Sequence, residues 1–345
     1  MLKSATFQSL TTVPNGKWSF ADGLNVIIGE NGLGKSHVLK ALYSMLKVQS
    51  GRSEELTKTS LEKAYAEKLS RVMRPESLGR LVKRKQGRDR CEIRLSMKQG
   101  GLNSAIGFAT NAKSQVDVLQ VPESALTQSP VYLPTRELVT LCPWFLNLYD
   151  NYHLEFEETW RDTVSLLGAP SVKGPRENRA AQLLKPLEEE LGGKVEMDAS
   201  SGRFYLRVTG EGRMEMPLVA EGLRKFAMLA RLINTGVLLG KGYLFWDEPE
   251  TNLNPKLIKT LARCIVELSA QGIQVFIATH SLFLLREFEI LLGRRGEDEP
   301  VSARYFGLSV ENEVITLRQS DDVNGVGPIT SLEESLAQSD RYMEL

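Results

Sequence analysis

Gly29-Glu30-Asn31-Gly32-Leu33-Gly34-Lys35-Ser36 matches the phosphate-binding loop pattern G-x-x-x-x-G-K-[ST] at every fixed position. Its glycines leave the backbone free to turn N–H groups inward around a β-phosphate. Lys35 would reach the β- and γ-phosphates, and Ser36 would ligate Mg²⁺. The sequence therefore predicts a site for ATP and Mg²⁺. The residues expected to bind ATP are Gly29, Asn31, Gly32, Gly34, Lys35 and Ser36.

The residues on either side of this loop have the pattern of a strand and a helix. Residues 24–28 form a short apolar run before it. After it, apolar residues recur at helical spacing, at Val38, Leu39, Leu42, Met45 and Leu46. A helix beginning near Lys35 would direct its positive end at the phosphates. This order of strand, loop and helix argues against a chance match to the motif.

A second pair of motifs supplies acidic and imidazole side chains. The apolar run 243–246 ends in Asp247 and Glu248, and the apolar run 273–278 is followed by Thr279 and His280. We expect Asp247 to hold Mg²⁺ together with Ser36, and Glu248 to act as the general base toward water. His280 closes its strand where a contact with a γ-phosphate is natural. Glu248 and His280 are thus the predicted catalytic residues.

Composition places the chain among globular proteins. Its 345 residues are 42% hydrophobic, enough for a substantial core. It has no apolar run of about 18 residues and no secretory signal pattern, so we expect a cytoplasmic protein without a membrane partner. Three widely spaced cysteines indicate neither a disulfide framework nor a zinc site.

Charge is balanced overall, with 43 basic and 43 acidic residues, but basic residues gather in one segment. The densest cluster consists of Arg80, Lys83, Arg84, Lys85, Arg88 and Arg90. Such a cluster is able to bind a nucleic-acid backbone or an acidic protein surface. It is equally typical of a solvated surface, and the sequence leaves these alternatives open.

The order of patterns along the chain suggests four parts. Residues 1–48 and 91–137 have strand character, beginning with an expected strand over 2–13, and form the first part of an ATPase core. Residues 49–90 are a basic, partly helical insertion. Residues 138–192 are a helical subdomain whose aromatic residues we expect to be its packing core. Residues 193–345 complete the core, with expected hairpins near 194–208 and 303–318.

Three motifs together resemble the ABC-type ATPase heads of the SMC, RecF and OLD group. They are residues 29–36, residues 247–255 and residues 278–281. More narrowly, the chain is similar to stand-alone AAA-family ATP-binding proteins of bacterial anti-phage defence systems of the PARIS, Septu and retron kinds. The resemblance covers nearly the whole chain. It implies an α/β ABC-ATPase head with a P-loop core sheet, an antiparallel β lobe and an inserted helical subdomain.

In this group the signature motif of one subunit completes the ATP site of its partner. The matching residues are Ala220, Glu221 and Gly222, ahead of a helix expected over 226–239. Ala220 stands where the group has serine. A glutamine loop is not evident, because residues 134–137 occupy its place. These departures imply slow turnover rather than loss of nucleotide binding.

The resemblance implies a slow ATPase that converts ATP and water to ADP and phosphate. Two copies, or a higher homo-oligomer, would close around Mg-ATP and control a separately encoded effector, such as a nuclease or a toxin, in phage defence. About 65 residues follow His280, fewer than a nuclease module of roughly 100 residues requires. A DNA-binding repair ATPase of the RecF and SMC kind is an alternative function, and a transporter nucleotide-binding subunit is another.

Overall fold

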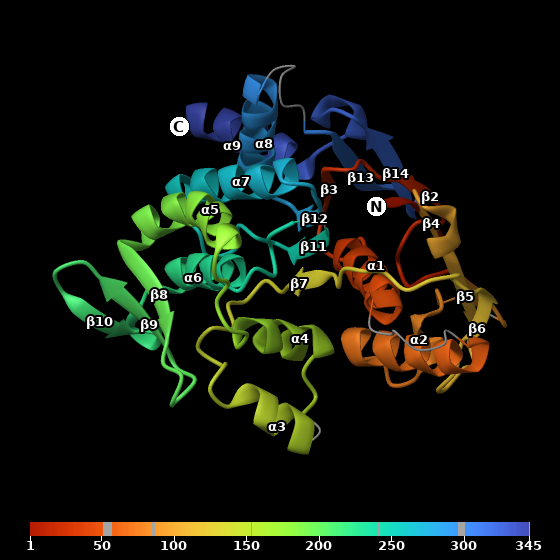
Figure 1. Ribbon diagram of the computed structural model, residues 1–345. Coiled ribbons are helices and arrows are strands. Elements are labelled where there is room, and N and C mark those ends of the chain that lie inside the picture. Colours follow the sequence, from red (N-terminus) through yellow and green to blue (C-terminus); the bar gives the residue numbers. More distant parts are fainter. Residues whose placement is uncertain (51–56, 85–86, 153, 241, 296–300, 345) are drawn as a thin grey trace.

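The computed structural model describes residues 1–50, 57–84, 87–152, 154–240, 242–295 and 301–344 (Figure 1). Its centre is a six-stranded sheet in the order β14-β13-β3-β12-β11-β7. Five of these strands are parallel, and β14 pairs antiparallel at one edge. The strands are β3 (Leu24–Gly29), β7 (Val131–Leu133), β11 (Gly242–Asp247), β12 (Ile273–Thr279), β13 (Ala303–Glu311) and β14 (Val314–Ser320).

Both faces of this sheet are buried, which explains the continuous apolar runs of its strands. Successive side chains of a strand point to opposite faces, so Val26 and Ile27 belong to two different core clusters. The cluster of Val26 includes residues of the helices α5 (Pro175–Leu191), α6 (Glu221–Asn234), α7 (Pro255–Ala270) and α8 (Leu282–Arg295). The cluster of Ile27 includes helix α1 (Lys35–Ser50). The phosphate-binding loop is therefore held between two packed layers.

A five-stranded antiparallel sheet covers part of the α1 face. Its order is β2-β1-β4-β5-β6, with β1 (Leu2–Gln8), β2 (Gly16–Ser19), β4 (Arg90–Met97), β5 (Ser104–Ala109) and β6 (Asp117–Gln120). Trp18 of β2 stacks on Phe306 of the central sheet at 5.2 Å. The expected strand over 2–13 is wrong in its extent, because Ser9 and Thr11 have positive φ angles and end it in a turn.

The basic segment 49–90 packs against its neighbours. Helix α2 (Lys58–Met73) contacts α1, and its residues Leu61, Tyr65 and Leu69 are buried in the same cluster as the antiparallel sheet. A short 3₁₀ helix, η1 (Leu78–Leu81), follows. The division of the chain into four parts stays a prediction, and this segment shares its buried residues with the parts on either side.

Helices α3 (Phe145–Tyr152) and α4 (Glu158–Leu167) precede α5, and a three-stranded sheet follows. That sheet consists of β8 (Gly193–Met197), β9 (Phe204–Val208) and β10 (Gly212–Glu215), so the hairpin expected near 194–208 is confirmed. The expected aromatic core is only partly correct. Phe145 is buried at the centre of an aromatic cluster, whereas Trp144, Tyr152 and Phe156 are exposed.

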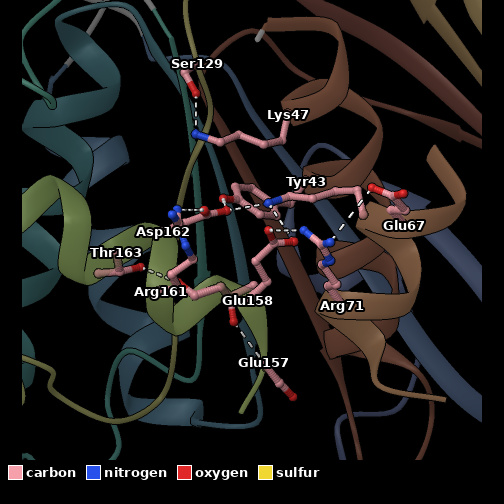
Figure 2. Close-up of polar contacts among 12 residues, drawn as sticks. Tyr43, Lys47, Glu67, Arg71, Ser129, Glu157, Glu158, Arg161, Asp162 and Thr163 are labelled. Atoms are coloured by element: carbon pink, nitrogen blue, oxygen red, sulfur yellow. Dashed lines mark hydrogen bonds and ion pairs between the residues drawn. The ribbon is translucent and has the colours of Figure 1, made fainter. Parts of the chain in front are cut away.

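Buried polar contacts join α4 to α1 and α2 (Figure 2). The Tyr43 hydroxyl of α1 donates to Asp162 Oδ2 at 2.5 Å, and Lys68 Nζ of α2 lies 2.6 Å from the same oxygen and 3.2 Å from Glu158 Oε2. Burial next to these carboxylates raises the pKa of Tyr43 well above its usual value. The helix that follows the phosphate-binding loop is thereby attached to the helical region.

The C-terminal part adds the predicted strand pair and one helix that the sequence did not predict. Strands β13 and β14 pair in register from Tyr305 with Ser320 to Glu311 with Val314, which confirms the hairpin. Helix α9 (Thr330–Met343) buries none of its residues. In the portion of the chain that the structure describes, we find no helix with the length and apolar character of a membrane span.

Candidate nucleotide-binding site

The phosphate-binding loop lies between the end of β3 and the start of α1. Gly32 and Gly34 have φ angles of +84° and +94°, which side-chain-bearing residues rarely adopt. A Cβ atom at Gly34 would lie 3.0 Å from Thr12 Oγ1. Glycine at position 34 thus serves both the backbone conformation and the close approach of Thr12 and Val13.

Lys35 is folded back over the loop. Its ammonium donates to the carbonyl oxygens of Gly29 at 2.7 Å and Glu30 at 2.8 Å. Burial lowers the pKa of Lys35, and the nearby carboxylates of Glu248 and Asp247 oppose this effect. The predicted phosphate ligand is therefore a desolvated cation directed at the loop.

Ser36 and Asp247 meet although 211 positions separate them in the sequence. The Ser36 hydroxyl donates to Asp247 Oδ1 at 3.0 Å, and the Tyr132 hydroxyl of β7 lies 3.5 Å from Oδ2. Burial raises the pKa of Asp247, while the hydrogen bond from Ser36 lowers it. Carboxylate and hydroxyl oxygens are suitable Mg²⁺ ligands, so the two predicted metal ligands fit that ion. A cavity of about 250 Å³ adjoins Asp247.

Glu248 follows in a strained backbone conformation. Its φ angle is +44°, and its N–H donates to the Ala278 carbonyl at 2.9 Å. Its Oε1 lies 3.3 Å from Nδ1 of His280, so the structure brings the two predicted catalytic residues together. Asn254 caps α7 by accepting from the Leu257 N–H at 3.0 Å, and Pro255 takes the first helical position.

The signature residues lie at the start of α6. The helix expected over 226–239 in fact covers Glu221–Asn234, so Glu221 and Gly222 belong to its first turn and Ala220 is its N-cap. A Cβ atom at Gly222 would lie 2.7 Å from the Asn252 carbonyl oxygen. The first turn of α6 therefore packs against the turn that follows Glu248 in the same chain.

Several site residues were missed in the sequence analysis. Lys225 and Glu250 are buried beside Glu248, and Tyr132 reaches Asp247 from β7. Burial raises the pKa of Glu250, which accepts a hydrogen bond from the Thr279 hydroxyl at 2.6 Å. The apolar run around Tyr132, between Pro130 and Pro134, indicates a short extended segment but not the strand with which it pairs. Lys225 and Glu250 adjoin the predicted signature and acidic motifs, whose patterns assign no role to these two residues.

Residues 134–137, which occupy the expected place of a glutamine loop, contact α6. Arg224 Nη1 lies 3.0 Å from Glu137 Oε1. The Glu137 carboxylate is nearly inaccessible and also accepts from the Thr140 hydroxyl at 2.9 Å. A buried charge paired in this way fixes the junction between this segment and α6.

Part of the basic cluster lines a large cavity next to the loop. Arg80, Lys83 and Arg84 border a cavity of about 720 Å³ together with Thr12 and His37. Because Thr12 contacts Gly34, the cavity neighbours the phosphate-binding loop. Outside this cavity, Arg90 is paired with Asp117 at 2.8 Å and Arg88 is exposed. Lys85 lies outside the described residues.

Solved structures with a similar fold include SMC heads. One is the crystal structure of an SMC head bound to the C-terminal winged-helix domain of ScpA, with 13% identity, coverage of 92% of this chain and 97% of that chain, and a TM-score of 0.56. Another is the Smc head domain with an extended coiled coil bound to the C-terminal domain of ScpA from Pyrococcus furiosus. It is 12% identical, covers 99% of both chains and has a TM-score of 0.51.

The chain thus has the α/β fold of SMC and ABC heads, with a P-loop sheet and an antiparallel β lobe, as the sequence predicted. Residues 124–286 match the family described as "AAA domain, putative AbiEii toxin, Type IV TA system". That segment begins after the phosphate-binding loop and includes Asp247, Glu248 and His280. No curated protein sequence matches the chain significantly.

The raised pKa of Asp247 predicts a stability cost at neutral pH. A carboxyl whose pKa is higher in the folded state loses its contribution to stability as pH rises, so Asp247→Asn should stabilise the nucleotide-free protein near neutral pH. We expect a rise in melting temperature on the order of 2 °C. This rise should shrink as pH falls through the raised pKa of the native Asp247 carboxyl, because that carboxyl then becomes neutral as well. Differential scanning calorimetry measures it.

The matched control is Asp340→Asn on exposed helix α9, which should leave the melting temperature unchanged. A lower melting temperature for Asp247→Asn at neutral pH would show that the native carboxylate stabilises the fold.

Proposed function

We propose that this protein is a slow ATPase switch that binds Mg-ATP and hydrolyses it to ADP and phosphate. The observation that carries the proposal is the 3.0 Å contact between Ser36 and Asp247, which joins the two halves of a nucleotide and metal site. The contact between Glu248 and His280 at 3.3 Å joins the residues that directly follow β11 and β12. Binding and water activation thus have adjacent residues.

Each of these residues has a physical role in the proposed reaction. The Lys35 ammonium would exchange the carbonyls of Gly29 and Glu30 for phosphate oxygens. Mg²⁺, held through Ser36 and Asp247, would supply charge neutralisation at the β- and γ-phosphates. Glu248 would accept the proton of the attacking water, and His280 would orient the Glu248 carboxylate and contact the γ-phosphate. Tyr132 would hold the second oxygen of Asp247.

We further propose that two copies close around two nucleotides. The N-terminus of α6 presents the N–H groups of its first turn, a favourable end for phosphate, and its N-cap residue Ala220 makes no side-chain cap. In the same chain this turn packs against residue 252, so its natural target is the nucleotide of a second copy. Ala220 has no hydroxyl to offer that phosphate, and Glu221 adds a negative charge there. Both features favour slow turnover.

The nucleoside end of ATP would occupy the cavity beside Gly34. This placement would put Arg80, Lys83 and Arg84 beside the nucleoside, where their side chains would donate hydrogen bonds to it. A DNA-binding function is the second candidate, favoured by the exposure of Arg84 and Arg88. ATP binding in this cavity and DNA binding would use some of the same basic residues. Binding experiments on variants are therefore needed to distinguish the two functions.

The partner we propose is a separately encoded effector, a toxin or a nuclease, in an anti-phage system. The matched family description names a toxin of a toxin–antitoxin system, and the similar SMC heads are bound to a domain of another protein. Both fit a head whose ATP state controls a bound protein. The transporter alternative has no supporting contact in the described structure.

Substitution of the two central charges should separate binding from hydrolysis. Lys35→Ala removes the phosphate ligand and should abolish ATP binding measured by isothermal titration calorimetry. Glu248→Gln should keep binding, lower turnover on the order of 10²- to 10⁴-fold, and accumulate an ATP-dependent dimer in light scattering. Lys256→Ala, an exposed cation in α7, is the control. A Glu248→Gln protein that binds ATP and stays monomeric would refute the dimer.

Neutralising the basic residues of the cavity tests its occupant. If the cavity holds the nucleoside end, Lys83→Ala and Arg84→Ala should each weaken ATP binding several-fold, and Arg88→Ala should leave it unchanged. If the cluster binds DNA, all three substitutions should weaken DNA binding. The plot of log affinity against log salt concentration should also become less steep, by about 1 for each phosphate group that the variant no longer binds. Fluorescence anisotropy with labelled DNA measures the second outcome.

Co-purification identifies the effector. Tagged Glu248→Gln protein, expressed with the neighbouring reading frames of its native operon and purified with ATP, should retain one of their products, which Lys35→Ala protein should not retain. Equal retention by both variants would contradict control by ATP. Retention of a membrane permease instead would support the transporter function.

A further inference from the structure

One buried cation near the site has no part in the reaction described so far. Lys225, in the second turn of α6, is 1% exposed, yet no carboxylate forms an ion pair with it in the described part of the chain. Its ammonium donates to the carbonyl oxygens of Glu248 and Pro249, each at 3.4 Å. An ammonium placed among carbonyl groups inside a protein is costly, so its position requires an explanation.

The backbone that Lys225 contacts is the strained turn at Glu248. Glu248 has a φ angle of +44°, and its carbonyl also accepts from the Thr251 N–H at 3.2 Å. A residue in such a conformation persists only where its surroundings over-determine it. Lys225 supplies two contacts to this turn, and the Ala278 carbonyl, which accepts from the Glu248 N–H, supplies another.

The charges around Lys225 favour its ammonium form. Burial lowers its pKa to about 8, and the carboxylates of Glu250, Glu221 and Glu248 counteract that effect. These three groups come from both elements packed around the lysine, α6 and the turn after β11. The ammonium is therefore retained by the electrostatic field of this small acidic group.

We propose that Lys225 is a positioning residue, which holds the turn at residues 248–249 so that the Glu248 carboxylate faces the attacking water. It also connects the first turn of α6, the proposed phosphate contact across the dimer, to the general base of its own chain. Movement of α6 on dimer closure would thus adjust the general base. This inference rests on the proposed ATPase function.

The test compares Lys225→Met with Lys225→Arg in steady-state ATP hydrolysis. Loss of the ammonium should lower kcat on the order of a hundredfold, because a small misplacement of a reacting group has effects of that size. The dissociation constant for ATP, measured by calorimetry, should stay within about twofold. Lys225→Arg keeps the positive charge and should recover part of kcat.

Two further variants separate positioning from a general loss of stability. Arg231→Met removes another buried cation of α6, one that donates to the Leu167 carbonyl at 2.9 Å on the side of the helical region. It should lower the melting temperature with kcat nearly unchanged. In single-turnover reactions, adding Lys225→Met to Glu248→Gln should cause no additional loss, because both changes remove the same function.

The outcomes distinguish the two proposals. Suppose that the native protein hydrolyses ATP, that Glu248→Gln abolishes this activity and that Lys225→Met leaves it intact. This result would leave the proposed ATPase function standing and overturn the role of Lys225. Losses that multiply in the double variant, or an equal loss of kcat in Arg231→Met, would also overturn it. If Lys225→Met fails to fold, kcat is compared between Lys225→Gln, which lacks the charge, and Lys225→Arg, which keeps it. A native protein without ATP hydrolysis would refute both proposals.

Discussion

The contact between Ser36 and Asp247 is the constraint on which the architecture depends. It requires the carboxyl ends of β3 and β11 to lie at the same edge of one sheet, with β12 between them. Parallel pairing satisfies this, and parallel strands in turn require crossover segments that cover both faces. Two core clusters follow from that requirement. The site is therefore a consequence of the sheet order rather than of local loop structure.

The same edge concentrates buried charge, which opposes stability. Burial lowers the pKa of Lys35 and Lys225 and raises that of Asp247 and Glu250, so all four groups are shifted toward neutrality. Each shift means that the folded protein stabilises the ionised form of the group less than water does. Such groups are retained where function needs them, and a ligand that brings phosphate and metal charges offsets part of the cost.

The motifs predicted the central sheet and the site residues from Gly29 to Ser36, Asp247 and Glu248, because each motif depends on neighbouring residues. Glycines indicate the loop, and acidic residues directly after an apolar strand indicate the metal site. The motifs do not predict contacts between segments that are distant in the sequence. Tyr132 meets Asp247 only because β7 pairs with β11, and no spacing in the sequence encodes that pairing. The helix expected to begin at residue 226 begins five residues earlier, at Glu221. Its first turn lies against Asn252, a contact between distant segments that the sequence pattern does not encode.

Two sets of buried contacts lead away from the phosphate end of the site. Helix α1 begins with Lys35 and Ser36 and is bonded through Tyr43 to Asp162 of α4. The turn at Glu248 is bonded through Lys225 to α6. A rotation of α4 would have to break a desolvated hydrogen bond or move α1 with it. A rotation of α6 would likewise have to break the contacts of Lys225 or move the turn at Glu248 with it. The first set joins the helical region to the residues proposed to bind phosphate and metal, and the second joins α6 to the proposed general base. The two proposed steps, nucleotide binding and hydrolysis, are therefore attached to different helices.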